Sequence, residues 1–149
     1  MEFIQPHKGA LLIYQPDSKR VYLWPFGSTK IPPLSLSPDN KLVQSPTGQK
    51  VDRSDIGSLL KNIQALQKKG HTEIAGEEAI GADNSLHVVV TGNPGATLGH
   101  VHRYAVWLDN KNGLPIKVVS YDTKDHMIET VVLEDIRINP IFPKEFFNP

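Results

Sequence analysis

The sequence predicts an α+β fold built mainly of antiparallel strands. Three observations lead to this prediction: one strongly amphipathic helical segment, two strand-like segments before it with five after it, and no alternation of strand and helix. Because a parallel nucleotide-binding sheet needs helical crossovers between its strands, such a sheet is disfavoured. We expect one helix on one face of an antiparallel sheet, within a single domain over residues 1–149.

The first predicted element is a hairpin over residues 9–25, with arms that read GALLIYQ and KRVYLWP. The turn between them contains Pro16, which fixes φ, and Asp17, whose side chain can bond the local backbone. Residues 26–50 follow and contain four prolines among serine, glycine and asparagine. We expect little regular structure there, and long connections of this kind are commonly functional.

A helix is expected over residues 53–69, where apolar side chains recur at the spacing of one helical face. Asp52 is expected to cap its first amides, and Val51 to pack on Ile56 as a hydrophobic staple. Gly70 is expected to end the helix by adopting a positive φ. The apolar face consists of Ile56, Leu59, Leu60, Ile63 and Leu66.

Five strands are expected after the helix. The first two, HTEIAGEEAI and NSLHVVVTG, are separated by a turn over residues 81–84. The last three form a meander with polar turns over residues 109–113 and 122–125.

The first strand of the meander is apolar on both faces. Tyr104, Val106 and Leu108 alternate with Ala105 and Trp107, and neighbouring side chains of a strand point to opposite faces. Each face therefore covers either core or a bound ligand.

Composition excludes several classes of function. The 16 basic and 16 acidic residues are mixed along the chain and give a formal charge of zero, which argues against nucleic acid as a partner and against a polybasic membrane anchor. The absence of cysteine excludes disulfides, thiolate catalysis and cysteine-based zinc sites. No transmembrane run and no export signal are visible in the sequence. Either the protein is cytoplasmic or its true amino terminus has been removed or replaced, and we favour removal.

No catalytic apparatus is identified, so we predict a protein that is not an enzyme and that uses no cofactor. A GxSxG elbow is absent, and TGNPGATLG lacks the lysine and the following serine or threonine of a phosphate loop. The carboxylates are spaced along strands in a way that favours solvated faces; they are Glu77, Glu78, Glu129, Glu134 and Asp135.

Three histidines provide an alternative. His100 and His102 lie two residues apart at the start of a strand, and His87 lies on a strand that is expected to be its neighbour. Three converging imidazoles can hold zinc with an open fourth position. Histidines at the surface or at strand ends, with no metal, are the preferred interpretation, because no HExxH spacing is present.

Aromatic and aliphatic side chains are the more informative signal. They either fill an ordinary core between helix and sheet or line a cleft in which a hydrocarbon chain completes the packing. The aromatic members are Tyr14, Tyr22, Trp24, Trp107, Tyr121, Phe142, Phe146 and Phe147.

The carboxyl-terminal half resembles the periplasmic lipoprotein-carrier superfamily of LolA and LolB type. The segments that carry the resemblance are WLDNKNGLPIKVVSYD, HMIETVVLEDIRINP and IFPKEFF. The matching positions are Trp107, Asp109, Gly113, Leu114, Pro115, Lys117, Tyr121, Asp122, Glu129, Asn139, Pro140, Pro143 and Phe146.

The resemblance implies a curved half-barrel sheet with the helix on its concave face and an apolar cavity that shelters acyl chains. It also implies a periplasmic location. Members of the superfamily carry further elements before the hairpin, so we expect that the amino-terminal part of the domain is missing from this chain. A shortened half-barrel exposes a sheet edge, and we expect self-association through it.

The leading functional hypothesis is therefore a non-enzymatic envelope module that binds a lipid or an acylated lipoprotein in an apolar cleft between sheet and helix. A regulatory or scaffolding domain that contacts another envelope protein without lipid is the alternative, and a histidine-metal enzyme is a third. The residues predicted to line the cleft are Leu12, Tyr14, Leu23, Leu59, Ile63, Val88, Val90, Val106 and Leu108.

Overall fold

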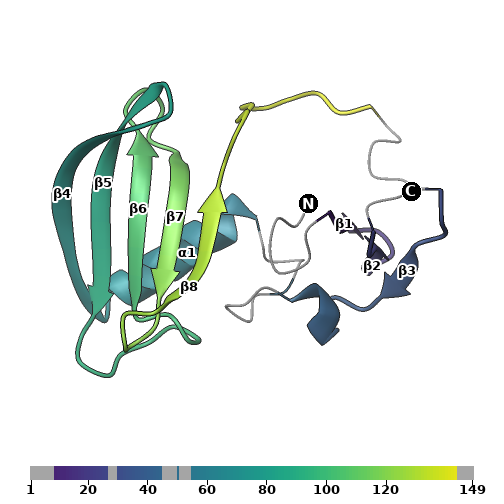
Figure 1. The fold of residues 1–149 in the computed structure, drawn as a ribbon, viewed down its shortest axis with the longest axis horizontal. Coiled ribbons are helices and arrows are strands. Elements are labelled where there is room, and N and C mark those ends of the chain that lie inside the picture. Colours follow the sequence, from purple (N-terminus) through teal and green to yellow (C-terminus); the bar gives the residue numbers. More distant parts are fainter. Residues whose placement is uncertain (1–8, 27–29, 45–49, 51–54, 144–149) are drawn as a thin grey trace. The chain divides into compact units, whose positions relative to one another are not determined.

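A computed structural model describes residues 9–26, 30–44, 50 and 55–143 of the chain. These residues divide into two compact units (Figure 1). Unit 1 contains the described residues up to 55 together with residues 139–143, and unit 2 contains residues 56–138. The single domain expected from the sequence stays a prediction.

Unit 1 is built on a three-stranded antiparallel sheet in the order β1-β2-β3. Strands β1 (Leu11–Gln15) and β2 (Arg20–Trp24) form the predicted hairpin. The expectation of little regular structure over residues 26–50 is confirmed for their described part, where the regular elements are the short strand β3 (Leu34–Leu36) and the 3-10 helix η1 (Lys41–Val43). The alternation of Leu34 and Leu36 is too short to stand out, and pairing with β2 makes it a strand.

One face of the unit 1 sheet packs on a small core. Side chains from β1 and β2 meet Val43, which η1 supplies. Asn40 fixes the start of η1, because its side chain accepts a hydrogen bond of 3.0 Å from the amide of Leu42. The buried members of this core are Ala10, Leu12, Val21, Leu23 and Val43.

Unit 2 consists of one helix and five antiparallel strands in the order β4-β5-β6-β7-β8. The elements are α1 (Ile56–Gln67), β4 (Gly70–Ile80), β5 (Asp83–Gly92), β6 (Arg103–Asp109), β7 (Pro115–Tyr121) and β8 (Met127–Val132). Each strand pairs with the next, the sheet is not closed, and α1 lies against one face (Figure 1). The predicted α+β fold with mainly antiparallel strands is confirmed.

The two faces of β6 separate as the alternation predicts. Tyr104 and Val106 are buried in the cluster that includes α1. Ala105 and Trp107 belong to a second cluster, which contains no residue of α1. Both faces of the sheet thus bury apolar side chains.

The caps predicted for the two ends of α1 have different outcomes. The predicted cap at Asp52 and the staple at Val51 lie outside the described residues. The expected positive φ at Gly70 was wrong, because Gly70 is the first residue of β4 and its φ is not positive. Glycine fits there for another reason: a Cβ would lie 1.9 Å from the carbonyl oxygen of Thr91.

Within the described part of the chain, no helix combines the length and the apolar character needed to cross a membrane.

Candidate apolar binding sites

The first candidate site is the apolar layer between α1 and the sheet of unit 2. It is tightest at the carboxyl end of α1, where Leu66 is fully buried and its Cδ1 atom lies 3.2 Å from the place a Cβ of Gly92 would take. Close packing of this kind leaves no room for a ligand at that end. The buried residues of the layer are Ile63, Leu66, Val90, Val101, Tyr104, Val106 and Val118.

Part of the layer is less well covered. Leu59, Leu108 and Ile128 pack against the buried cluster but remain partly exposed. Val88 is also partly exposed, and it pairs with Val106 on the same face of the sheet. An apolar ligand of unit 2 would meet these side chains first.

Tyr104 is a polar side chain within this layer. Burial raises its pKa to about 12, and the negative charge of Glu129 acts in the same direction. The phenol is therefore neutral at physiological pH and adds no charge to the layer.

The nine lining residues predicted from the sequence fall into two groups. Six of them belong to unit 2 and lie on facing surfaces of α1 and the sheet: Leu59, Ile63, Val88, Val90, Val106 and Leu108. The other three, Leu12, Tyr14 and Leu23, belong to the core of unit 1. Within each unit the structure brings the predicted residues together.

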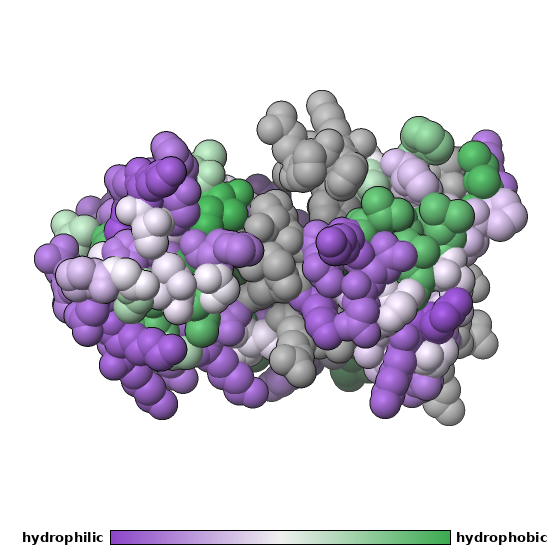
Figure 2. Space-filling model, turned by 90° about the horizontal axis from the view of Figure 1, so that it is seen from below, coloured by the Kyte–Doolittle hydropathy of each residue, from purple (hydrophilic) through white to green (hydrophobic). Residues whose placement is uncertain are grey.

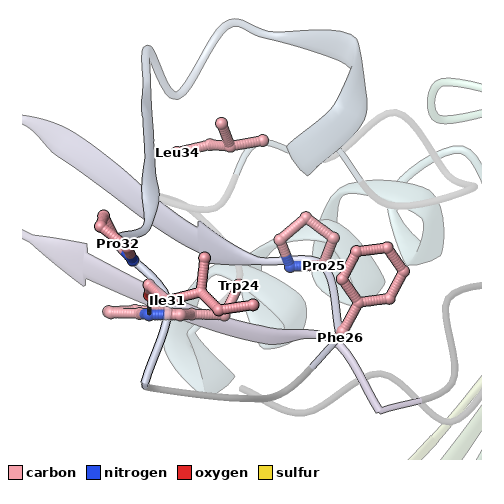
Figure 3. A pocket seen from close by; sticks show the side chains of 6 residues that line it. All are labelled: Trp24, Pro25, Phe26, Ile31, Pro32 and Leu34. Carbon is pink, nitrogen blue, oxygen red and sulfur yellow. Dashed lines mark hydrogen bonds between the residues drawn. The ribbon is translucent and has the colours of Figure 1, made fainter.

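The second candidate site is a hollow of about 180 Å³ in unit 1, at the connection between β2 and β3. Figure 3 shows Trp24, Ile31 and Pro32 on one side of it, Pro25 and Phe26 on the other, and Leu34 above. All six lining side chains are apolar or aromatic.

The walls of this hollow offer a ligand no side-chain hydrogen bond. Trp24 is buried, and its indole N–H donates to the carbonyl oxygen of Ile31 at 2.9 Å, so only ring carbons remain for a ligand. Pro25 and Pro32 have no backbone N–H. The side chains that line the hollow therefore offer a ligand apolar contact only.

The rim of the hollow is exposed. Phe26 is 86%, Ile31 58% and Leu34 49% accessible to solvent, which is unusual for side chains of this size so close together. Figure 2 shows hydrophobic residues, in green, at the surface of unit 1 on the right of the view. Sequence reasoning placed these residues in an irregular loop, although apolar side chains next to Pro25 and Pro32 were a signal that the loop is more than a connection.

The sheet face opposite α1 carries polar aromatic contacts. The ring of His87 stacks on Trp107 with 4.2 Å between centroids, and Lys117 lies 4.7 Å from the Trp107 ring. The indole N–H of Trp107 donates to Glu78 at 2.7 Å. These contacts cover Trp107 and bind the edge strand β4 to β6.

The three histidines of the metal hypothesis are not brought together as one group. His87 lies in the middle of β5, whereas His102 precedes β6 and its Nδ1 contacts the carbonyl oxygen of Ala96 at 2.7 Å. Among residues 9–26, 30–44, 50 and 55–143, no group of three or more histidine or carboxylate side chains is arranged to hold a metal ion.

Comparison with known proteins gives structural neighbours only. No protein-family model matches the chain, and no curated protein does. Among solved structures, the chain is similar to a DUF1329 family protein from Desulfovibrio piger, with 14% identity, a TM-score of 0.43, and coverage of 87% of this chain and 53% of that one.

Two further solved structures are similar. A domain named for outer membrane lipoprotein sorting, from Vibrio parahaemolyticus, is 17% identical with a TM-score of 0.45, over 92% of this chain and 56% of that one. A LolA superfamily protein from Nitrosomonas europaea is 15% identical with a TM-score of 0.45, over 87% and 57%. One of these neighbours bears the name of the superfamily given above, and the chain spans little more than half the length of each.

Proposed function

We propose that this chain is a non-enzymatic binding module that accepts the end of a hydrocarbon chain, from a lipid or from the acyl group of a lipoprotein, in the hollow of unit 1. The observation that carries the proposal is the wall of six side chains without a free hydrogen-bonding group. A peptide strand would leave its backbone polar groups unpaired there, which is costly, whereas an alkyl chain has none.

The size of the hollow sets how much ligand it takes. Its volume of about 180 Å³ is close to that of an engineered cavity of about 150 Å³ that binds benzene in another protein. It therefore holds about six carbon atoms. At about 0.8 kcal/mol for each methylene fully removed from water, the upper limit is about 5 kcal/mol, or a Kd no lower than about 0.2 mM, because the lining side chains Phe26, Ile31 and Leu34 leave the hollow open to solvent.

A longer chain would therefore need a second apolar surface. The exposed outer parts of the lining side chains Phe26, Ile31 and Leu34 continue the apolar surface at the mouth of the hollow. That the nine residues named from the sequence line a ligand cleft stays a separate prediction. A role in lipoprotein sorting at a periplasmic location is proposed together with this ligand class, on the resemblance of residues 107–147 to the carrier superfamily.

Filling the hollow tests the proposal. Leu34→Trp places a larger side chain in the hollow, and we expect it to lower the affinity for a dansyl-labelled undecanoic acid by at least about tenfold, the equivalent of about two methylenes. The matched control is Leu42→Trp, because Leu42 is 59% exposed in unit 1 and does not line the hollow. Native mass spectrometry of protein purified without detergent should also find bound lipid. Equal affinity of Leu34→Trp and the unmodified protein would refute the site.

One observation favours the alternative, a regulatory or scaffolding domain that contacts another protein. Strand β4 is eleven residues long and pairs only with β5 in the described part of the sheet, and its Ile74 is 71% exposed. An unpaired strand edge recruits further strands, including those of a second copy. Light scattering after size-exclusion chromatography should then show self-association that Ile74→Lys reduces, and a monomer at every concentration would count against it.

A further inference from the structure

Four of the five described histidines lie at one end of the unit 2 sheet. His71 is the second residue of β4, His100 and His102 lie between β5 and β6, and His126 directly precedes β8. In an antiparallel sheet the start of one strand lies beside the end of the next. The connections β5–β6 and β7–β8 therefore share the lower end of the sheet in Figure 1 with the start of β4.

Backbone hydrogen bonds join these segments into one surface. The amide of Gly92 donates to the carbonyl of His102 at 2.8 Å, and the amide of His102 donates to the carbonyl of Tyr121 at 2.8 Å. The amide of Asn93 donates to the carbonyl of Lys69 at 2.7 Å. We call the surface formed by residues 68–73, 93–103 and 122–127 the histidine end.

The charge of the histidine end depends on its imidazoles. With neutral histidines it carries four cations against three carboxylates, a net charge of about +1. Imidazole is the side chain that gains a charge between pH 8 and pH 5. Protonation of all four histidines would raise the net charge to about +5. The charged residues are the cations Lys68, Lys69, Arg103 and Lys124 and the carboxylates Glu73, Asp122 and Asp125.

The carboxylates do not cancel this gain. The pKa of Asp122 lies below its usual range, because its carboxylate accepts hydrogen bonds from the backbone amide of His126 and from that of Lys124, so it has the same charge at pH 7 and at pH 5. Asp125 is paired with Arg103. The nearest carboxylate contacts of the exposed imidazoles are His126 to Asp122 at 3.3 Å and His71 to Glu73 at 4.0 Å.

An apolar side chain stands among these charges. Met127 follows His126 and is 66% exposed. The ring of Tyr121 is covered by Arg103 at 3.7 Å and is not free to stack on a nucleic-acid base. Clustered cations are attracted to anionic lipid, and an exposed apolar side chain beside them can enter the interfacial region.

We propose that the histidine end docks on an anionic lipid bilayer when the medium becomes mildly acidic. The inference does not rest on the hollow of unit 1, because it uses other residues and a different attraction. The attraction is electrostatic, so it strengthens as the imidazoles gain charge and weakens with salt.

Co-sedimentation with vesicles tests this proposal. The probes are vesicles of phosphatidylcholine alone and of equal parts phosphatidylcholine and phosphatidylglycerol. From about pH 7.5 to about pH 5.5 we expect the partition coefficient on the anionic vesicles to rise at least tenfold, since each cation near such a surface contributes a factor of about five. About 0.5 M salt should abolish the rise, and phosphatidylcholine vesicles should show none.

Two triple variants decide where the effect arises. His71→Gln, His100→Gln and His126→Gln together remove three exposed imidazoles and should abolish the rise. Lys41→Gln, Lys61→Gln and Lys111→Gln remove the same charge from exposed positions outside the histidine end and should preserve it. Equal losses in both variants, or a rise that the histidine variant retains, would overturn the proposal. Leu34→Trp should leave the rise unchanged, which separates this result from the test of the hollow, and circular dichroism checks that each variant is folded.

Discussion

The helix–sheet layer of unit 2 and the hollow of unit 1 are made of the same kinds of side chain and differ in how they are filled. In the layer, apolar residues recur at the periods of a helix and of strands, and the two surfaces close on each other until Leu66 is fully buried. In the hollow they surround Pro25 and Pro32 in a connection without a period, and Phe26 and Ile31 remain exposed. In this chain the periodic apolar pattern builds a core, and the apolar residues without a period leave a hollow.

The largest expected effect is on the filled region. Leu66→Ala should lower the free energy of unfolding by about 4 kcal/mol, because it removes a fully buried side chain and leaves a cavity between α1 and the sheet. Urea denaturation followed by circular dichroism measures it. A loss below about 1 kcal/mol would mean that the layer collapses around the smaller side chain, and the contrast with the hollow would fail.

Gly70→Ala should have the next largest effect, about 3 kcal/mol. The added Cβ would lie 1.9 Å from the carbonyl oxygen of Thr91, and that oxygen belongs to the backbone, so β4 or β5 must shift. The same denaturation experiment applies. Gly113→Ala is the control for strain without a clash, because no atom lies within 4 Å of its Cβ position while its φ is +72°. If the two variants lose equal stability, close approach at Gly70 is not what fixes the end of α1.

The next largest effect is a pH dependence that comes from Tyr104, a buried residue of the helix–sheet layer. The folded-state pKa of Tyr104 is about 12 and its ordinary value is 10.0, so the folded state keeps the phenolic proton that the unfolded state releases. The contribution of Tyr104 to stability does not change below about pH 10, and it falls by about 2.5 kcal/mol as the pH rises from 10 to 12. Tyr104→Phe should remove this fall in denaturation curves recorded across that range. A fall that Tyr104→Phe retains would have to come from other groups.

The sequence predicted the elements whose pattern is local. The hairpin β1–β2, the alternation of Tyr104 and Ala105, and the positions of Leu59, Ile63 and Leu66 on the core-facing side of α1 were confirmed, because each depends on a period visible over a few residues. The same position for Ile56 and Leu60 stays a prediction. The backbone at Gly70 was not predicted, because its constraint comes from Thr91 on another strand. Strand β3 was not predicted for the same reason, because it depends on pairing with β2.

The candidate sites divide in the same way. Six predicted lining residues lie in one layer of unit 2, because helical and strand periods place them on facing surfaces. The hollow could not be predicted, because it depends on how a loop folds back to bring Leu34 near Trp24. The metal alternative assumed that His87 lies close to His100 and His102, because their strands were expected to be neighbours. His87 instead lies in the middle of β5, away from the end of the sheet where the connection between β5 and β6 lies.

The smallest expected effect on stability comes with a large effect on binding, and it tests the comparison most directly. Phe26→Ser should change the free energy of unfolding by less than about 0.5 kcal/mol, because the side chain is 86% exposed. It should still weaken binding of dansyl-labelled undecanoic acid severalfold, because Phe26 forms one wall of the hollow. Isothermal titration with the probe and urea denaturation on the same sample give both values. Leu42 is also largely exposed, at 59%, and lies away from the hollow, so Leu42→Ser should change neither the free energy of unfolding nor the affinity for the probe. A loss of stability at Phe26 as large as that at Leu66 would show that the wall of the hollow is core after all, and the distinction between the two regions would be lost.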